Sequence, residues 1–153
     1  MIIRPANEGD IVDLLAIEQD CFGDEKFTPE TIRAFIERED GIVLVAIEGS
    51  TIVGSAMCMF SERLGEGRIV SVAALKGSRS KGIGKGLLEE CERIFRSRNL
   101  AKYTLEVETS NEAAIRLYLS HGYEVIGIIQ DYYSFGRHAY LMEKKGQANE
   151  PVV

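Results

Sequence analysis

The sequence predicts a mixed α/β (α+β) domain built on a single sheet, and three observations support this. The chain has 153 residues, which suits one domain with its own core. Segments with the β-branched or alternating pattern of strands are interleaved with segments whose apolar residues recur at helical spacing. Two strand segments within residues 41–60 flank Gly49-Ser50, a pair typical of a tight hairpin. The expected order is β-αα-βββ-α-β-α-ββ, with about seven strands and about four helices.

The chain begins with a short strand over residues 1–6 and continues with two helices. Asn7 is a suitable N-cap for the first helix, which carries its apolar residues on roughly one face. These residues are Ile11, Leu14, Leu15 and Ile17. The second helix is expected over residues 27–40, because Thr28 is a suitable N-cap and Pro29 occupies the first helical position.

The central part of the chain places a strand, a glycine-rich turn and a helix in succession. The strand is expected over residues 68–75 and leads directly into the turn at residues 76–86. A helix follows from Gly84, with apolar residues at helical spacing. These are Leu87, Leu88, Cys91, Ile94 and Phe95. Residues 103–108 then alternate between apolar and polar side chains, as a strand does.

The C-terminal part predicts a helix and two strands. The helix covers residues 110–122, beginning at a Ser-Asn pair that can cap it and ending at a glycine. The strands are expected over residues 123–129 and 138–144, around a loop at residues 130–137. Residues 146–153 form a polar tail that we expect to fray.

The composition excludes several classes of function. The formal net charge is −6, whereas a domain that binds nucleic acid is usually basic, so we expect no nucleic-acid partner. No apolar run reaches the length of a membrane span. The first ten residues also lack the basic start and apolar stretch of a signal peptide. We therefore expect a cytoplasmic protein with no membrane partner.

Cysteine and histidine are too sparse to predict a metal site. Cys21, Cys58 and Cys91 are too far apart for a zinc-binding spacing, and their odd number does not suit a disulfide framework. We expect free thiols in a reducing compartment and no metal. His121 and His138 are the only histidines, which leaves little material for a histidine-based metal site or a Ser-His-Asp triad.

The turn at residues 76–86 reads KGSRSKGIGKG and combines glycines and basic residues with no carboxylate. In an acidic chain, this composition indicates a phosphate ligand. A P-loop is excluded, because Ile83 and Gly84 stand where that motif needs Lys and then Ser or Thr. A dinucleotide-binding loop is disfavoured, because Leu87 replaces the third glycine and the turn follows a hairpin instead of opening a βαβ unit.

The turn does match R-x-x-G-x-G, through Arg79, Gly82 and Gly84, at the start of a helix. Main-chain N–H groups at a helix N-terminus bind anions, and the helix dipole together with Lys81 and Lys85 favours a diphosphate. The alternative is a merely flexible connector, since a pattern this short often occurs by chance.

A second motif lies downstream of the turn. Residues 105–123 read LEVETSNEAAIRLYLSHGY and fit L-x-V-x-x-x-N-x-x-A-x-x-L-Y-x-x-x-G-[FY] at every fixed position: Leu105, Val107, Asn111, Ala114, Leu117, Tyr118, Gly122 and Tyr123. Together the two motifs resemble the GNAT superfamily of acetyl-coenzyme A-dependent N-acetyltransferases, over nearly the whole chain. The resemblance implies the GNAT fold, with a mixed and mostly antiparallel sheet, in a single domain of residues 1–145. It also implies acetyl-CoA as the donor and CoA as a product.

Within the superfamily, the chain is most similar to enzymes that acetylate protein N-termini. These are the bacterial ribosomal-protein-alanine type and the archaeal and eukaryotic catalytic-subunit type. The stretches LEV, DYYSFGRHAYLMEK and IEQDCF carry this closer likeness. It implies a protein or peptide N-terminus as substrate, and it leaves open whether an auxiliary subunit or the ribosome is a partner.

The resemblance assigns the residues that would bind the coenzyme. The main chain of Val72, Ala73 and Ala74 would hold the pantetheine arm and polarise the acetyl carbonyl. Asn111 would hydrogen-bond the coenzyme near the pantetheine, and Tyr118 would lie beside its sulfur. The main-chain N–H groups of the turn would cradle the pyrophosphate, at Arg79, Ser80, Lys81, Gly82, Ile83 and Gly84.

The resemblance also assigns catalytic roles. Glu106 would take the proton of the incoming amine, directly or through a water, and Tyr118 would protonate or hydrogen-bond the leaving thiolate. Tyr132 and Tyr133 would help form the slot for the substrate N-terminus. An α-amine has a pKa of about 7.7–8.0, so a moderate base suffices. Because no covalent nucleophile is needed, we expect direct attack in a ternary complex, and Cys91 is a poor candidate for an acyl-enzyme.

The chain departs from the family pattern in two places. The usual Val-x-Pro between strand and turn is absent from AALKGS, where Ala74 replaces the valine and no proline follows. The acidic pair often found after the glycine of the C-terminal loop is replaced by Arg137 and His138. The first change leaves the conformation of the turn open, and the second can alter which N-terminal residues are accepted.

Other interpretations remain open. Glu106 shares a strand face with Thr104 and Glu108, and charges on an alternating strand usually form its solvated face. Glu108 is an alternative base. The superfamily also contains enzymes for internal lysines and small-molecule amines, and a lysine, with a pKa of about 10.4, demands more from the base. A non-catalytic acyl-coenzyme A binding module would need neither Glu106 nor Tyr118.

Overall fold

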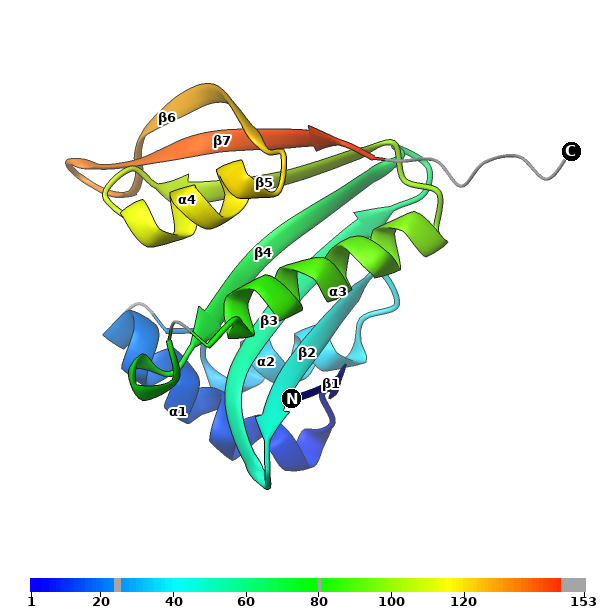
Figure 1. Ribbon diagram of the computed structural model, residues 1–153, viewed down its shortest axis with the longest axis vertical. Coiled ribbons are helices and arrows are strands. Elements are labelled where there is room, and N and C mark those ends of the chain that lie inside the picture. The colour runs from blue at the N-terminus through cyan, green and yellow to red at the C-terminus, as the bar shows by residue number, and fades with distance from the viewer. Residues whose placement is uncertain (24–25, 80, 147–153) are drawn as a thin grey trace, which may run out of the picture. The chain divides into compact units, whose positions relative to one another are not determined.

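The computed structural model describes residues 1–23, 26–79 and 81–146. These residues contain a seven-stranded sheet in the order β1-β2-β3-β4-β5-β7-β6 (Figure 1). The order of elements along the chain confirms the predicted β-αα-βββ-α-β-α-ββ. Ser80 and residues 147–153, on which two expectations fell, lie outside the described residues.

The sheet is mixed and mostly antiparallel, as expected. β4 pairs with β5 in parallel, whereas the pairs β1–β2, β2–β3, β5–β7 and β6–β7 are antiparallel. The strands are β1 (Ile2–Pro5), β2 (Gly41–Glu48), β3 (Thr51–Ser61), β4 (Glu66–Ala74), β5 (Lys102–Glu108), β6 (Glu124–Ser134) and β7 (Arg137–Lys145). The helices are α1 (Ile11–Phe22), α2 (Pro29–Glu37), α3 (Ile83–Ser97) and α4 (Glu112–Ser120), with 3₁₀ turns η1 (Glu8–Asp10) and η3 (Lys76–Ser78).

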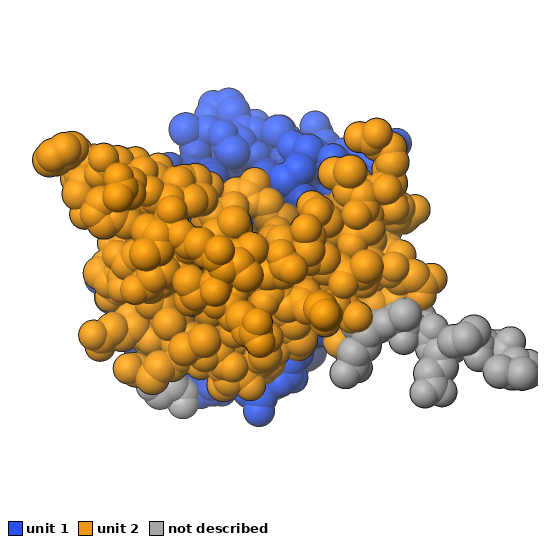
Figure 2. All heavy atoms as spheres, turned by 90° about the horizontal axis from the view of Figure 1, so that it is seen from above, with its two compact units in different colours: residues 1–59, 70–93 blue, residues 60–69, 94–153 orange. Residues whose placement is uncertain are grey.

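The chain packs as two compact units, which Figure 2 shows in different colours. Unit 1 comprises residues 1–59 and 70–93, and unit 2 comprises residues 60–69 and 94–153. Strand β4 and helix α3 each cross from one unit to the other. A single domain over residues 1–145 stays a prediction.

Unit 1 has helices on both faces of its strands, with α1 and α2 on one face and α3 on the other (Figure 1). The first face is closed by an apolar cluster from both helices, β2 and β3, which includes Leu14, Ile32, Val43, Val45 and Met57. On the other face, α3 approaches β3 closely at Gly54. A Cβ on Gly54 would stand 2.6 Å from Ile83 and 2.9 Å from the Ala73 carbonyl, so a larger residue would push α3 away from the sheet.

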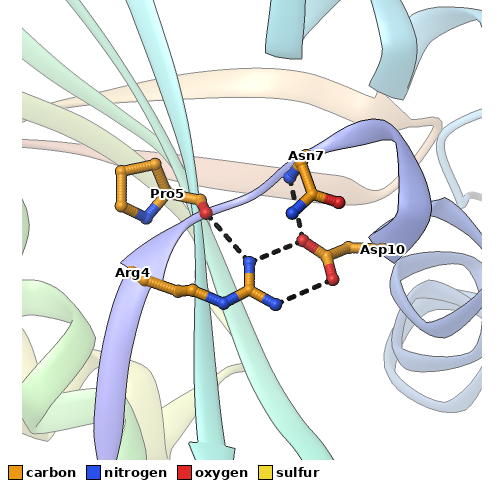
Figure 3. A network of polar contacts seen from close by, with 4 residues as sticks. All are labelled: Arg4, Pro5, Asn7 and Asp10. Atoms are coloured by element: carbon orange, nitrogen blue, oxygen red, sulfur yellow. Dashed lines mark hydrogen bonds and ion pairs between the residues drawn. The ribbon is translucent and has the colours of Figure 1, made fainter.

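A polar network fixes the start of unit 1 (Figure 3). Two Arg4 nitrogens donate to the two Asp10 carboxylate oxygens at 2.7 and 3.0 Å, and the Asn7 N–H donates to the same carboxylate at 2.8 Å. The Arg4 contact lowers the pKa of Asp10. Asn7 therefore begins η1, and Asp10 is the residue that stands at the N-cap of α1.

Unit 2 packs α4 against one face of β5 and β7 (Figure 1). Along β5, buried positions alternate with half-buried ones, as the sequence predicted. The buried Tyr103 of β5 contacts Phe95 of α3, with ring centroids 5.1 Å apart. Gly67 of β4 lies against that phenyl ring, where a Cβ would stand 2.6 Å from its atoms.

The C-terminal hairpin is longer than the sequence predicted. Residues 130–137 were expected as a loop, but β6 and β7 continue until only Phe135 and Gly136 form the turn. Asp131 explains the difference. It adopts a φ of 53°, its Oδ1 accepts the Gly136 N–H at 2.7 Å, and its own N–H donates to His138 Nδ1 at 3.0 Å. These bonds close the end of the hairpin without a long loop.

Candidate active site

The glycine-rich turn leaves β4 at Leu75 and reaches α3 at Ile83. The Leu75 N–H donates to the Val53 carbonyl of β3 at 2.9 Å, so the turn begins from a fixed point on the sheet. Gly82 has a φ of +77°, and among the described residues no heavy atom lies within 4 Å of the place where its Cβ would stand. The left-handed backbone, and not lack of space, is therefore what requires glycine there.

The first turn of α3 carries the candidate anion-binding groups. The Gly86 N–H donates to the Gly82 carbonyl at 2.9 Å, which is the first helical hydrogen bond. The N–H groups of residues 83–85 precede that bond and have no carbonyl to bind within the helix. Lys81 and Lys85 are exposed beside them. The turn thus offers main-chain donors, a helix dipole and positive charge, which fit a diphosphate.

The Arg79 side chain binds the protein itself. Its Nε donates to the Ala74 carbonyl at 3.2 Å, and its Nη2 lies 3.6 Å from Cys21 Sγ of α1. The Cys21 thiol donates to the same carbonyl at 3.2 Å. Arg79 therefore folds the turn back onto the end of β4, and the pyrophosphate contact predicted for it concerns its main-chain N–H. The other two residues assigned to the pantetheine arm, Val72 and Ala73, are half-buried and buried in β4.

Unit 2 carries the remaining predicted residues, one at the start of α4 and one within it. Asn111 is its N-cap, and the side-chain oxygen accepts the Ala114 N–H at 3.2 Å. The oxygen is thus engaged in capping, while the amide NH₂ remains the group that could donate to a ligand. Tyr118 is buried, and its ring meets Tyr123 edge-on with centroids 5.9 Å apart. α4 therefore holds the Tyr118 ring in one place.

Glu106 lies in β5, where an arginine from β4 binds it. Nε and Nη2 of Arg68 donate to Glu106 Oε2 at 3.2 and 3.1 Å. Nη2 also donates to the Tyr132 hydroxyl of β6 at 3.3 Å. The Glu106 side chain is only 17% exposed, so it isn't on the freely solvated face that an alternating strand would suggest. Arg68 joins the predicted base to one of the predicted substrate-slot tyrosines.

The sequence did not single out Arg68, because its role depends on strand register. β4 and β5 pair in parallel with Arg68 opposite Thr104. Glu106 lies two residues further along β5, on the same face, and is the diagonal neighbour of Arg68. An arginine in a strand next to a carboxylate-bearing strand was the available signal, but no motif predicts which residues face each other.

Glu108, the alternative base, is engaged on both of its oxygens. Arg137 of β7 binds Oε1 through Nε at 2.9 Å and also through Nη2, and the Ser110 hydroxyl donates to Oε2 at 2.7 Å. The Arg137 guanidinium also lies 5.6 Å from the centre of the Tyr133 ring. The arginine that departs from the family pattern thus has a partner within unit 2, and this pairing disfavours Glu108 as the proton acceptor.

Tyr132 and Tyr133 lie at the end of β6 and not in a separate loop. Their rings meet edge-on with centroids 5.0 Å apart, although neighbouring residues on a regular strand point to opposite faces. The irregular register of β6 between Ile129 and Ser134 allows this arrangement. Partial burial raises the pKa of Tyr133 to about 12, so its hydroxyl is protonated at neutral pH and can donate a hydrogen bond.

Among the three cysteines, none is placed as a nucleophile. All three are free thiols, and Cys58 and Cys91 are buried in unit 1. The neighbouring Cys58 thiol, together with burial, raises the pKa of Cys91, which keeps that thiol protonated. In the described part of the chain, no cluster of three or more His, Cys, Asp or Glu could hold a metal ion. No helix there is long and apolar enough to cross a membrane.

The sequence is similar to those of known acetyltransferases. Residues 11–123 match the acetyltransferase (GNAT) family. The chain is 32% identical, over 155 aligned residues, to an uncharacterized N-acetyltransferase of Methanocaldococcus jannaschii; the alignment covers 100% of the chain and 97% of that protein. It is 30% identical to the N-alpha-acetyltransferase RimI of Mycobacterium tuberculosis, over 80% of the chain and 77% of that protein.

The fold is also that of a solved acetyltransferase. The ribosomal-protein-S18-alanine N-acetyltransferase of Escherichia coli superposes with a TM-score of 0.86 at 24% identity, covering 99% of the chain and 98% of that protein. The family match extends from α1 through α4 and includes both motifs of the sequence. Acetyltransferases of this fold use acetyl-coenzyme A. The chain therefore belongs to the acetyltransferase (GNAT) family and is an N-acetyltransferase of the acyltransferase class.

Proposed function

We propose that the protein acetylates the α-amine of protein or peptide N-termini, by direct attack on acetyl-coenzyme A in a ternary complex. The observation that carries this proposal is the network of Glu106, Arg68 and Tyr132, which connects a shielded carboxylate to an aromatic pair suited to a peptide end. The N-alpha-acetyltransferase RimI of M. tuberculosis, similar over 80% of the chain, supports the same substrate class. Three free thiols agree with action in a reducing cytoplasm.

The coenzyme would be bound by unit 1 through main-chain groups. The turn from Arg79 to Gly84 would hold its pyrophosphate, and the N–H groups of Val72, Ala73 and Ala74 would stabilise negative charge on the acetyl oxygen. The coenzyme supplies an acetyl group as an activated thioester. The fit rests on the left-handed Gly82, the N–H groups of residues 83–85, which have no carbonyl to bind within the helix, and the exposed Lys81 and Lys85.

The amine would be handled by unit 2. Within the described residues, both hydrogen bonds to Glu106 end on Oε2, which leaves Oε1 to accept the proton of the amine, directly or through a water. Arg68 keeps the carboxylate oriented through its two hydrogen bonds to Oε2. Tyr118, held by α4, would donate to the sulfur as it leaves, and Tyr132 and Tyr133 would flank the peptide end.

A thiol-release assay with acetyl-coenzyme A and short peptides tests the proposal. Peptides that begin with Ser, Ala or Met are each supplied with a free or a blocked N-terminus, and each contains one internal lysine. We expect turnover with free termini and none with blocked ones. Turnover that survives blocking would contradict the proposal in favour of the lysine. Turnover only with small amines, or coenzyme binding without turnover, would also overturn it.

A further inference from the structure

The C-terminal end of α1 is bonded to the glycine-rich turn at two places. The carboxylate of Asp20 accepts the main-chain N–H of Lys76 at 2.8 Å, and the thiol of Cys21 donates to the Ala74 carbonyl at 3.2 Å. The two contacts lie on either side of Leu75, where β4 ends and η3 begins. Helix α1 therefore fixes the start of the turn, through contacts to the main chain of Ala74 and Lys76.

We infer that Asp20 is a positioning residue for the coenzyme: it fixes the turn in the shape that binds the pyrophosphate. This rests on the proposed role of residues 79–84 in holding that group, but not on the identity of the amine. Asp20 need not touch the coenzyme itself. It acts through Lys76, three residues before Arg79.

The missing proline of the family pattern gives Asp20 its role. In the Val-x-Pro pattern, Ala74 takes the place of the valine, which puts Lys76 at the position of the proline. A proline there would fix its own φ but would have no N–H to donate. Lys76 lacks the fixed φ and has the N–H, and that N–H is the group that Asp20 accepts. A hydrogen bond from α1 thus replaces a covalent ring as the constraint on the turn.

A purely electrostatic role for Asp20 and the proposed positioning role predict opposite changes in coenzyme affinity when the carboxylate is removed. A carboxylate next to a diphosphate site repels the ligand, so removal of Asp20 by charge alone would tighten coenzyme binding. Removal of a hydrogen bond that shapes the site would weaken binding instead. The sign of the change therefore separates the two explanations.

The first experiment is a calorimetric titration of coenzyme A into the full chain and its variants. We expect Asp20→Ala to raise the Kd about tenfold, the effect of losing one hydrogen bond to a charged group. Asp20→Asn, which keeps an acceptor oxygen, should stay within about threefold of the wild type. Asp13→Ala removes an exposed carboxylate from the same helix, far along it from the turn, and should leave the Kd unchanged. Unchanged or tighter binding by Asp20→Ala would overturn the inference.

The second experiment restores the family residue. Leu75 has φ −54° and ψ 139°, an extended conformation outside the helical region that a following proline disfavours, so the residue before position 76 permits Lys76→Pro. In that background the proline at position 76 has no N–H for Asp20 to accept. We expect Asp20→Ala to have no further effect on the Kd there, but its full effect in the Lys76→Ala background, which removes the same charge and keeps the N–H. An equal effect in both backgrounds would show that Asp20 does not act through Lys76.

Steady-state kinetics distinguishes positioning from general damage. For Asp20→Ala we expect the KM for acetyl-coenzyme A to rise with the Kd, while kcat at saturating coenzyme and the KM for the amine stay within about twofold. A parallel loss of kcat would indicate a disturbed fold and would contradict the inference. If the wild type bound coenzyme A but acetylated no N-terminus, the proposed function would fail, and the titrations would still decide the role of Asp20.

Discussion

The two units present their functional groups in different ways. The candidate coenzyme-binding groups of unit 1 are mostly main-chain N–H groups, and their placement depends on the left-handed Gly82 and on the start of α3. The candidate catalytic groups of unit 2 are side chains, and two arginines bind the two carboxylates of β5. In the proposed function, one region would act through backbone shape and the other through paired charges.

This difference determines how each region should respond to substitution. A turn made of main-chain donors tolerates most changes of side chain and is sensitive to changes in backbone conformation. A network of paired charges is sensitive to the loss of one partner, because the other is left half-buried and unpaired. We therefore expect variants of the glycine-rich turn in unit 1 to change coenzyme affinity, and variants of the Glu106–Arg68 network in unit 2 to change turnover.

The largest effect is expected for Glu106→Gln. This change keeps the shape of the side chain but removes the proposed proton acceptor, so kcat should fall at least about 100-fold while the Kd for coenzyme A stays within about twofold. Tyr118→Phe should slow transfer in the same way. Stopped-flow or steady-state turnover, combined with coenzyme titration, measures both quantities.

Glu108→Gln is the matched control for that prediction, since Glu108 lies two residues along the same strand face. Its oxygens are bound by Arg137 and Ser110, so we expect a change in kcat of less than about threefold. If Glu108→Gln lost as much activity as Glu106→Gln, the assignment of the base to Glu106 would be wrong.

The contrast between the units also explains what the sequence could and could not predict. The turn was predictable because glycine spacing and missing carboxylates reflect backbone conformation, which is local in the chain. The order of strands and helices followed from apolar periodicity for the same reason. The C-terminal hairpin shows where local composition fails to predict structure. Its segment 130–137 has the composition of a loop, but Asp131 adopts a left-handed conformation and makes one main-chain and one side-chain hydrogen bond. These allow β6 and β7 to continue through the segment.

Partners across strands were not predictable, because they depend on register. Arg68 and Glu106 are 38 positions apart in the chain, and Arg137 and Glu108 are 29 apart. A shift of one residue would turn either arginine to the opposite face of the sheet. Similarly, nothing local to Asp20 indicates that its carboxylate would meet Lys76.

The next largest effect concerns a buried carboxylate of unit 1, for which we expect a change in stability and not in coenzyme affinity. Glu18 of α1 lies in unit 1 and is 2% exposed, and within the described residues neither carboxylate oxygen has a well-aligned hydrogen-bond partner. The main chain of Phe27 only partly offsets the effect of burial. Burial raises the pKa of Glu18 from 4.5 to about 7. Between these values the folded protein keeps a proton that the unfolded chain releases, so this residue makes folding less favourable as the pH rises.

We expect Glu18→Gln to be more stable than the wild type by about 2 kcal/mol at pH 8, with the difference shrinking towards pH 5. Urea unfolding at a series of pH values measures it. Glu30→Gln, at an exposed position of α2, is the control for removal of a carboxylate from a helix in the same unit. A difference that did not grow with pH would show that the buried carboxylate does not oppose folding.

The smallest effect is expected for Gly82→Ala, and it tests whether unit 1 really works through backbone shape. An added Cβ would meet no atom of the described residues within 4 Å, so the cost is expected from the left-handed φ of +77°. That cost is about 1 kcal/mol, which should raise the Kd for coenzyme A about fivefold and leave kcat at saturating coenzyme nearly unchanged.

Gly77→Ala is the matched control, because Gly77 lies in the same turn with equal space around it and without a left-handed φ. Equal losses in both variants would mean that the turn is sensitive to any side chain. No loss in Gly82→Ala would mean that the left-handed conformation is not what binds the coenzyme, and the contrast between the two units would then no longer hold.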